Sequence, residues 1–228
     1  MPATPRFAPT GDALRTVFDR LFEAYGPQSW WPADSPFEVA VGAVLTQNAA
    51  WGNVEQAIDN LRARGLLSLE ALLGCESGRI ADAIRPSGYF NVKTQRLLSL
   101  CRFLGEEGGL AGFARREPGD RRGALLAVHG IGPETADDIL LYALQQPVFV
   151  IDTYTRRLLQ RLGLADGRES YEDLRLGFED ALGPDVALFN EFHALIVRHA
   201  KVSCRKQPDC TGCVLRALCE TGRGASEG

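Results

Sequence analysis

The chain has 228 residues, of which 45% are hydrophobic, and a net charge of −4. This composition excludes a disordered chain and provides enough apolar side chains for one large or two small folded domains, while the acidic balance argues against a broad, non-specific grip on phosphate. No apolar run approaches the length of a membrane span and the N-terminal segment lacks a secretory pattern, so we expect a cytoplasmic protein without membrane contacts, nucleoid-associated if it is prokaryotic.

Apolar residues recur at helical spacing along almost the whole chain, and the sequence predicts an all-α fold. The one strand-like run, PVFVID, has no partner strand. A segment rich in glycine and charge, residues 105–123, is expected to form loops around one short helix. The other expected helices cover residues 11–25, 37–45, 53–64, 68–73, 78–84, 92–105, 153–162, 171–182 and 186–199.

In the middle of the chain, the segment LLAVHGIGPETADDI predicts two helices joined by a tight turn. Glycines in such a turn let a phosphate approach the backbone, and the N–H groups at the start of the second helix favour an anion. An ordinary glycine-rich connection would explain Gly130 and Gly132. The apolar residue between them and the Thr135-Ala136 pair match the helix-hairpin-helix motif of DNA-binding proteins.

Asp152 follows the apolar run and precedes a predicted helix. An N-cap role explains this residue by itself, because aspartate is among the preferred caps. The same position keeps the carboxylate ionised through the helix dipole and N–H hydrogen bonds. Such a carboxylate can stabilise positive charge on a sugar, or orient a water molecule, while an N-glycosidic bond is cleaved.

Four cysteines crowd the end of the chain with the spacing C-x5-C-x2-C-x5-C. In a reducing compartment this pattern indicates a metal centre rather than disulfides, because one small site must gather all four sulfur atoms. Four thiolates suit either an iron–sulfur cluster or a zinc ion. The residues are Cys204, Cys210, Cys213 and Cys219.

With the hairpin, the aspartate and the cysteines in this order, the chain resembles the endonuclease III branch of the helix-hairpin-helix DNA glycosylases. The resemblance runs from SPFEVAVGAVLTQN through SGYFNVKTQRL to the cysteines. It implies a six-helix barrel over residues 35–146, with the hairpin at about 124–141, and a cluster domain over residues 1–34 and 147–228. The two domains would flank a cleft in which double-stranded DNA presents a flipped, damaged base to a catalytic Asp152. We expect a monomer.

Two positions depart from the family pattern. Bifunctional members carry a hairpin lysine that attacks the sugar, and this chain has Glu134 at that position. A carboxylate cannot form an imine, so the resemblance implies a monofunctional glycosylase with weak or absent AP-lyase activity. The first cysteine gap is five residues where the family usually has six. The resemblance still implies a [4Fe–4S] cluster, with zinc as the alternative.

All three tryptophans, Trp30, Trp31 and Trp51, lie in or beside loops. Core packing would explain any one of them. Together with the LTQN segment they resemble the subgroup that removes 3-methyladenine. That resemblance places Trp31 and Trp51 against a flipped, positively charged purine, with Trp30 at the pocket wall.

The resemblance also assigns residues that contact DNA. Gln47 and Asn48 would fill the gap left by the flipped nucleotide, and Tyr89 would be the wedge, although capping or packing roles also suit them. Basic pairs such as Lys93 and Arg96 are read as solvated surface or as phosphate contacts. The remaining expected DNA contacts are His129, Gly130, Gly132, Glu134, Thr135 and Arg156.

The leading hypothesis is therefore a base excision repair glycosylase, monofunctional and acting on alkylated purines such as 3-methyladenine. A first alternative is an endonuclease III-type glycosylase for oxidised pyrimidines, with weak or no lyase activity. A second is a non-catalytic iron–sulfur protein that binds damaged DNA, against which Asp152 argues. A small zinc-containing interaction protein would explain the cysteines but leaves the hairpin unexplained.

Overall fold

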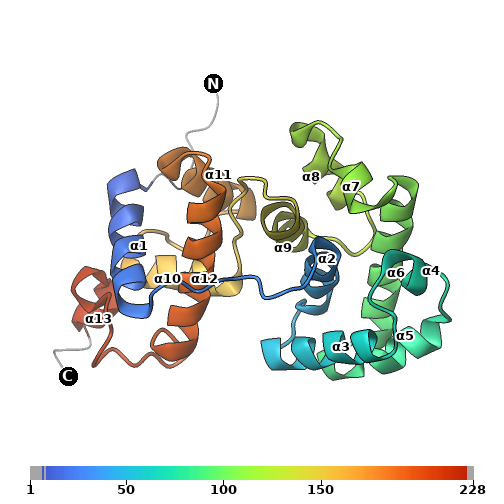
Figure 1. The fold of residues 1–228 in the computed structure, drawn as a ribbon. Helices are drawn as coiled ribbons and strands as arrows, with labels where there is room; N and C mark the ends of the chain where they lie inside the picture. The colour runs from blue at the N-terminus through green and yellow to red at the C-terminus, as the bar shows by residue number, and fades with distance from the viewer. Residues whose placement is uncertain (1–6, 8, 225–228) are drawn as a thin grey trace. The chain divides into compact units, whose positions relative to one another are not determined.

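A computed structural model describes residues 7 and 9–224 (Figure 1). The outermost parts of the expected cluster domain, residues 1–6, 8 and 225–228, lie outside the described residues. In the described residues the secondary structure is helical, without a strand, which confirms the all-α prediction. None of these helices is long and apolar enough to cross a bilayer. The chain divides into two compact units, Trp31–Gln146, and Met1–Trp30 together with Pro147–Gly228.

The unit Trp31–Gln146 is built around one buried helix, α2 (Pro36–Leu45). Ser35 caps it by accepting a hydrogen bond from the Glu38 N–H at 3.2 Å, with proline in the first turn as the sequence predicts. Every residue from Glu38 to Leu45 is buried, because α3, α6, α9 and η2 all contact this helix. The surrounding elements are α3 (Trp51–Ala63), α4 (Leu69–Leu73), α5 (Ser77–Ala83), η1 (Arg85–Ser87), α6 (Phe90–Glu106), α7 (Gly109–Phe113), α8 (Pro118–Leu126), α9 (Pro133–Asp138) and the π-helix η2 (Ile139–Ala143).

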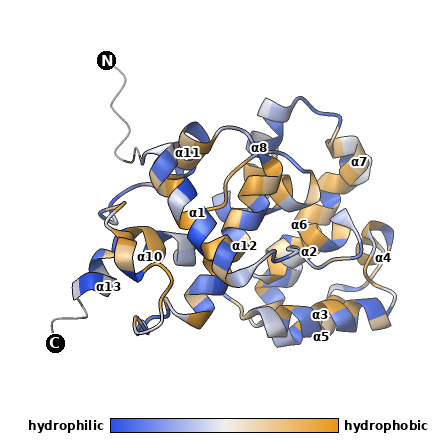
Figure 2. Cartoon of the chain, turned by 60° about the vertical axis from the view of Figure 1, so that its left-hand side comes forward, coloured by the Kyte–Doolittle hydropathy of each residue, from blue (hydrophilic) through white to orange (hydrophobic). Residues whose placement is uncertain are grey.

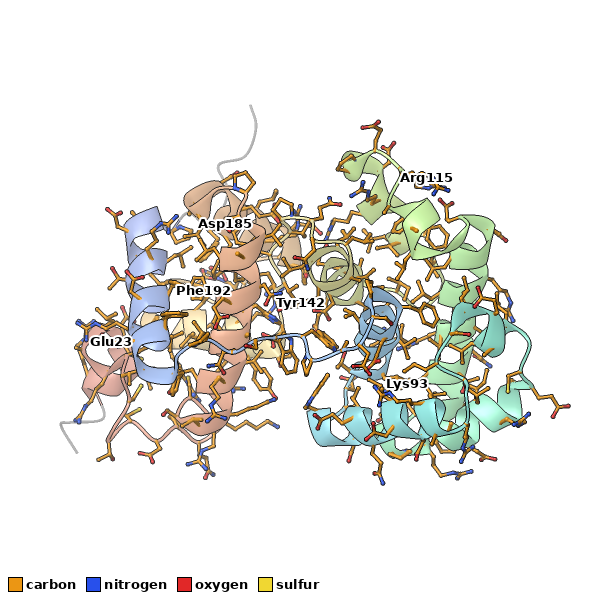
Figure 3. All side chains as sticks on the ribbon, viewed as in Figure 1. Glu23, Lys93, Arg115, Tyr142, Asp185 and Phe192 are labelled. Carbon is orange, nitrogen blue, oxygen red and sulfur yellow. The ribbon has the colours of Figure 1, made fainter. Side chains whose placement is uncertain are left out.

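The other unit packs its helices around a phenylalanine core. The ring of Phe149 stacks on Phe178 with centroids 3.9 Å apart, and Phe192 meets both rings edge-on. Phe192 is labelled in Figure 3. Hydrophobic residues form bands along these helices (Figure 2), as expected for amphipathic helices around one core. The elements are α1 (Gly11–Tyr25), α10 (Thr153–Leu162), α11 (Tyr171–Leu182), α12 (Val186–Val202), η3 (Arg216–Leu218) and α13 (Glu220–Gly224).

The strand-like run before Asp152 is a buried, extended segment without a strand partner. Side chains of α11 accept its N–H groups instead: Glu179 Oε1 accepts from Phe149 at 3.0 Å and the Tyr171 hydroxyl from Ile151 at 3.3 Å. These hydrogen bonds satisfy backbone donors that a sheet would otherwise need to pair. The segment thereby delivers Asp152 to the start of α10.

Candidate active site and cysteine centre

Asp152 is the N-cap of α10 and is largely buried. Its Oδ1 accepts a hydrogen bond from the Thr155 N–H at 2.7 Å, as a capping aspartate should. Its other oxygen, Oδ2, lies 3.7 Å from Nε2 of His193 on α12, and 12% of the side chain remains exposed. One carboxylate oxygen is thus fixed by the helix and the other faces a histidine.

The carboxyl of Asp152 is held in its ionised form. Burial raises the pKa of Asp152, but the His193 ring and the N–H of Thr155 together outweigh burial, so the pKa lies below its usual range. No local sequence pattern points to His193, because its position opposite Asp152 depends on how α10 and α12 pack. The site therefore contains a titratable neighbour that the sequence analysis missed.

The helix-hairpin-helix consists of α8, a turn and α9. Gly130 in the turn has φ of +85°, and a Cβ there would overlap Cγ of Arg96, so both backbone conformation and space require glycine. The two helices are joined by a buried, bidentate ion pair in which Arg122 Nε and Nη2 lie 2.7 and 3.1 Å from the two oxygens of Asp137. The hairpin is therefore a rigid unit.

Gln47, expected to enter DNA, is hydrogen-bonded to the hairpin. Its Nε2 donates to the Gly130 carbonyl at 3.0 Å and to Thr135 Oγ1 at 2.9 Å. Its Oε1 accepts from Arg96 Nη1 at 2.6 Å. In this conformation the amide joins the loop after α2 to the hairpin and to α6.

Lys93 is not the solvated surface cation that the basic pairs suggested; that interpretation is wrong. Lys93, labelled in Figure 3, is 1% exposed. Its Nζ donates to the carbonyls of Leu45 and Ser87 at 2.7 and 2.6 Å. The charge sits inward because two backbone carbonyls at helix ends need donors, and a long lysine reaches both. A phosphate cannot reach this amine.

Asn48 and Tyr89 occupy exposed loop positions with left-handed backbones. Their φ values are +53° and +44°, and Tyr89 is 73% exposed. Positive φ is tolerated by asparagine but is an outlier for a bulky tyrosine. The structure thus presents both side chains outward, as a DNA contact requires, while their DNA-contacting role stays a prediction.

Two of the three tryptophans lie together. The rings of Trp31 and Trp51 meet edge-on with centroids 5.3 Å apart, and Tyr142 of η2 lies 5.4 Å from Trp31. Gly42 of α2 makes room for this group, since a Cβ there would lie 2.9 Å from Cζ2 of Trp31. Tyr142 was missed because it sits inside a continuous apolar run. Trp30 belongs to the other unit.

The other expected DNA contacts differ in accessibility. His129, Gly132 and Glu134 are exposed, whereas Thr135 is buried and bonded to Gln47. Arg156 is half-buried, and its Nη1 donates to the carbonyl of Glu169 at 2.9 Å. Their roles in DNA binding stay predictions.

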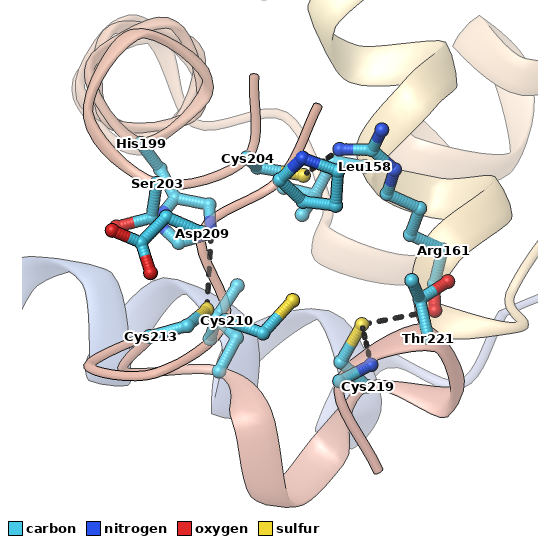
Figure 4. A pocket seen from close by; sticks show the side chains of 13 residues that line it. Leu158, Arg161, His199, Ser203, Cys204, Asp209, Cys210, Cys213, Cys219 and Thr221 are labelled. Atoms are coloured by element: carbon cyan, nitrogen blue, oxygen red, sulfur yellow. Dashed lines mark hydrogen bonds between the residues drawn. The ribbon is translucent and has the colours of Figure 1, made fainter. Parts of the chain in front are cut away.

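The four C-terminal cysteines line one cavity, together with Arg161 and His199 (Figure 4). None forms a disulfide. Cys204 Sγ accepts a hydrogen bond from Arg161 Nη1 at 3.2 Å, and Cys219 Sγ accepts one from the Gly222 N–H at 3.4 Å. Such donors stabilise thiolates and are the usual surroundings of cluster sulfurs, so the residues fit an iron–sulfur cluster. In the part of the chain described, no group of three or more His, Cys, Asp or Glu side chains is arranged to hold a single metal ion.

Several known DNA repair proteins are similar to this chain in sequence. Residues 41–184 match the family model described as HhH-GPD superfamily base excision DNA repair protein. A protein of Methanocaldococcus jannaschii named as a DNA repair glycosylase is 40% identical over 211 residues, which cover 91% of this chain and 96% of that protein. Endonuclease III of Escherichia coli is 28% identical over 82% of this chain and 84% of its own length.

Solved structures are similar as well. A 3-methyladenine DNA glycosylase of H. pylori, bound to 1,N6-ethenoadenine, has a TM-score of 0.72 and 30% identity, covering 84% of this chain and 95% of that one. Endonuclease III in a non-covalent complex with DNA has a TM-score of 0.82 at 20% identity, covering 96% and 100% of the two chains, a likeness that shows the fold.

Proposed function

The chain belongs to the HhH-GPD superfamily of base excision DNA repair proteins and is a DNA glycosylase, and on this basis we propose that it is monofunctional and removes alkylated purines such as 3-methyladenine. The observation that carries the hydrolytic mechanism is Asp152, whose carboxylate is ionised and partly exposed at a helix N-terminus. The ligand is a damaged base flipped out of double-stranded DNA.

Asp152 supplies the charge that the reaction needs. As the bond between base and sugar breaks, positive charge develops on the deoxyribose, and the carboxylate stabilises it while orienting the attacking water. Because Thr155 fixes one carboxylate oxygen, the other is positioned before the substrate arrives. The water adds to the sugar, its proton passes to the carboxylate, and the base leaves with the bonding electron pair.

Glu134 supports a monofunctional enzyme. It is exposed in the first turn of α9, at the hairpin position where bifunctional relatives carry lysine. A carboxylate cannot form the imine on which strand cleavage depends. Lys93, the lysine nearest to the hairpin in sequence, is buried and already bonded to two carbonyls. The product is then an intact strand with an abasic site.

The aromatic group supports an alkylated purine. Trp31, Trp51 and Tyr142 present electron-rich rings to one another, and such rings attract a cationic base through stacking and cation–π interactions. The similar H. pylori structure is that of a 3-methyladenine DNA glycosylase. Several relatives are named endonuclease III, and they favour the alternative of oxidised pyrimidines.

For the cysteine centre we propose a [4Fe–4S] cluster held by the four thiolates; it would stabilise the C-terminal unit, with Arg161 and Gly222 donating to its sulfur ligands. Iron and acid-labile sulfide of about four atoms each per chain are expected in protein purified without oxygen. One zinc per chain in place of iron would contradict this assignment. We further expect a monomer in the cytoplasm, associated with the nucleoid in a prokaryote.

The test is a panel of duplexes that carry 3-methyladenine, thymine glycol or uracil. We expect strand breaks only at 3-methyladenine and only after alkali treatment, and Asp152→Asn should abolish them while leaving affinity for an abasic-site analogue. Breaks without alkali, together with a borohydride-trapped complex, would refute monofunctional chemistry. Cleavage confined to thymine glycol would establish the alternative substrate.

A further inference from the structure

His199 is a buried histidine that lies between the cysteine cavity and helix α1. It belongs to α12, which packs against α1, and is 1% exposed. Its Nδ1 lies 2.9 Å from the hydroxyl of Tyr25, the last residue of α1, and its Nε2 lies 3.7 Å from Sγ of Cys213. A dashed line in Figure 4 marks the contact with Cys213. The ring of His199 therefore connects α1 to one of the four cysteines.

The state of the Cys213 sulfur decides which ring nitrogen of His199 carries the proton. A cysteine that binds iron is a thiolate without an S–H group, so its sulfur only accepts hydrogen bonds and Nε2 is the donor. Sulfur is larger than oxygen, so an N–H···S hydrogen bond is longer than an N–H···O one, in keeping with the distance of 3.7 Å. Burial disfavours a second proton on the ring, which leaves Nδ1 as an acceptor.

Tyr25 is suited to donate to this acceptor. Burial raises the pKa of Tyr25 above its ordinary 10.0, so the phenol keeps its proton at neutral pH. The O–H group then donates to Nδ1 of His199 and holds the ring in the tautomer with the proton on Nε2. Two hydrogen bonds in series polarise each other, so the first one strengthens the second.

A hydrogen bond to a cysteine ligand changes the reduction potential of an iron–sulfur cluster. The partial positive charge of the N–H group stabilises the reduced cluster, which carries one more negative charge, more than the oxidised cluster. Two of the cysteine sulfurs accept hydrogen bonds from Arg161 and Gly222. His199 supplies a donor to a third sulfur, and Tyr25 sets its tautomer.

We propose that Tyr25 and His199 form a two-step relay, which directs one N–H group at the Cys213 ligand and raises the reduction potential of the [4Fe–4S] cluster. Neither side chain binds iron, and both are positioning residues. The proposal rests on the proposed cluster and adds which side chains outside the four ligands control its potential. Through Tyr25, that control comes from α1, far from the cysteines in the sequence.

The test uses the full-length holoprotein, purified without oxygen, and measures the midpoint potential of the one-electron couple of the cluster at an electrode. Tyr25→Phe removes one hydroxyl group and keeps the ring, so the His199 proton is free to move to Nδ1. At a fixed applied potential the ratio of reduced to oxidised cluster should fall about tenfold, a shift of about 59 mV, while iron stays at about four atoms per chain. Tyr89→Phe, in the other unit, is the matched control and should keep the wild-type potential.

Two substitutions of His199 separate the hydrogen bond from the packing. His199→Phe fills the space without a donor and should lower the potential at least as much as Tyr25→Phe. His199→Gln places an amide N–H near the position of Nε2 and should restore most of the wild-type potential. A wild-type potential in Tyr25→Phe with its full iron content would overturn the relay alone. Zinc in place of iron in the wild-type protein would overturn the proposed cluster itself, and the relay with it.

Discussion

Lys93 provides a prediction that can be measured directly, since the chain has only three lysines. Burial, and in second place the charge of Arg96, lowers the pKa of Lys93 from its ordinary 10.5 to about 8. A neutral amine still has two N–H groups, which is enough for the carbonyls of Leu45 and Ser87. Deprotonation therefore removes a buried charge without removing either hydrogen bond.

This pKa has a definite effect on stability. The folded pKa lies below the unfolded one, so below pH 8 the buried charge destabilises the fold by about 3 kcal/mol, at about 1.4 kcal/mol for each pH unit between the two values. As pH rises from 8 toward 10.5, the unfolded chain binds more protons than the folded one, and this penalty is relieved. Between about pH 7.5 and 9.5, wild type should gain about 2 kcal/mol relative to Lys93→Met.

Two measurements check this reasoning. Lysine labelled with 13C at Cε gives three resonances, and the one that is absent in Lys93→Met should titrate near pH 8. The gap in melting temperature between wild type and Lys93→Met should move by about 4–8 °C in favour of wild type from about pH 7.5 to 9.5. Melting curves that shift in parallel, or a Lys93 resonance that does not titrate below pH 10, would refute the assigned cost of burial.

The other predictions concern the hairpin and the active site. Arg122→Met removes a charged partner of the buried Asp137 carboxylate and should lower the free energy of unfolding by about 3 kcal/mol. Arg85→Met, in an exposed pair, should change it by less than about 1 kcal/mol, and equal melting temperatures of the two variants would contradict this. Glu134→Lys should create a borohydride-trapped complex with lesion DNA that wild type does not form. His193→Asn should raise the pKa of Asp152 and move the acidic limb of kcat/KM to higher pH; an unchanged limb would show that His193 does not act on this carboxylate.

The sequence predicted the elements whose signals are local. The cap and proline at Ser35 fix the start of α2, and Asp152 caps α10, because capping depends on residues within one turn. The helical content of residues 105–123 was underestimated: one short helix was expected, and the segment contains α7 and most of α8, which begins at Pro118. Proline at the first helical position is a start signal, and it was outweighed by the surrounding glycine and charge.

The sequence could not predict contacts between residues far apart in the chain. Lys93 bonds a carbonyl 48 positions away, and Gln47 bonds one 83 positions away. A lysine in a basic stretch and an amide after a helix look the same whether they face solvent or protein. The environment of Lys93 and Gln47 depends on the packing that brings α2, α6 and the hairpin together. The approach of His193 to Asp152 likewise depends on the packing of α12 against α10.

The direction of the Tyr142 side chain depends on the number of residues in the turn formed by the π-helix η2. The N–H of Leu144 donates to the carbonyl of Ile139, five residues earlier, so this turn holds one residue more than an α-helical turn. Deleting one residue inside this turn would remove the extra residue and return the turn to α-helical winding, so the helix before and after it keeps its facing. Only the side chains within the turn would change direction. Substitutions leave the wide turn intact, whereas a single-residue deletion inside it should change the contact of the Tyr142 ring with Trp31 while the rest of the helix survives.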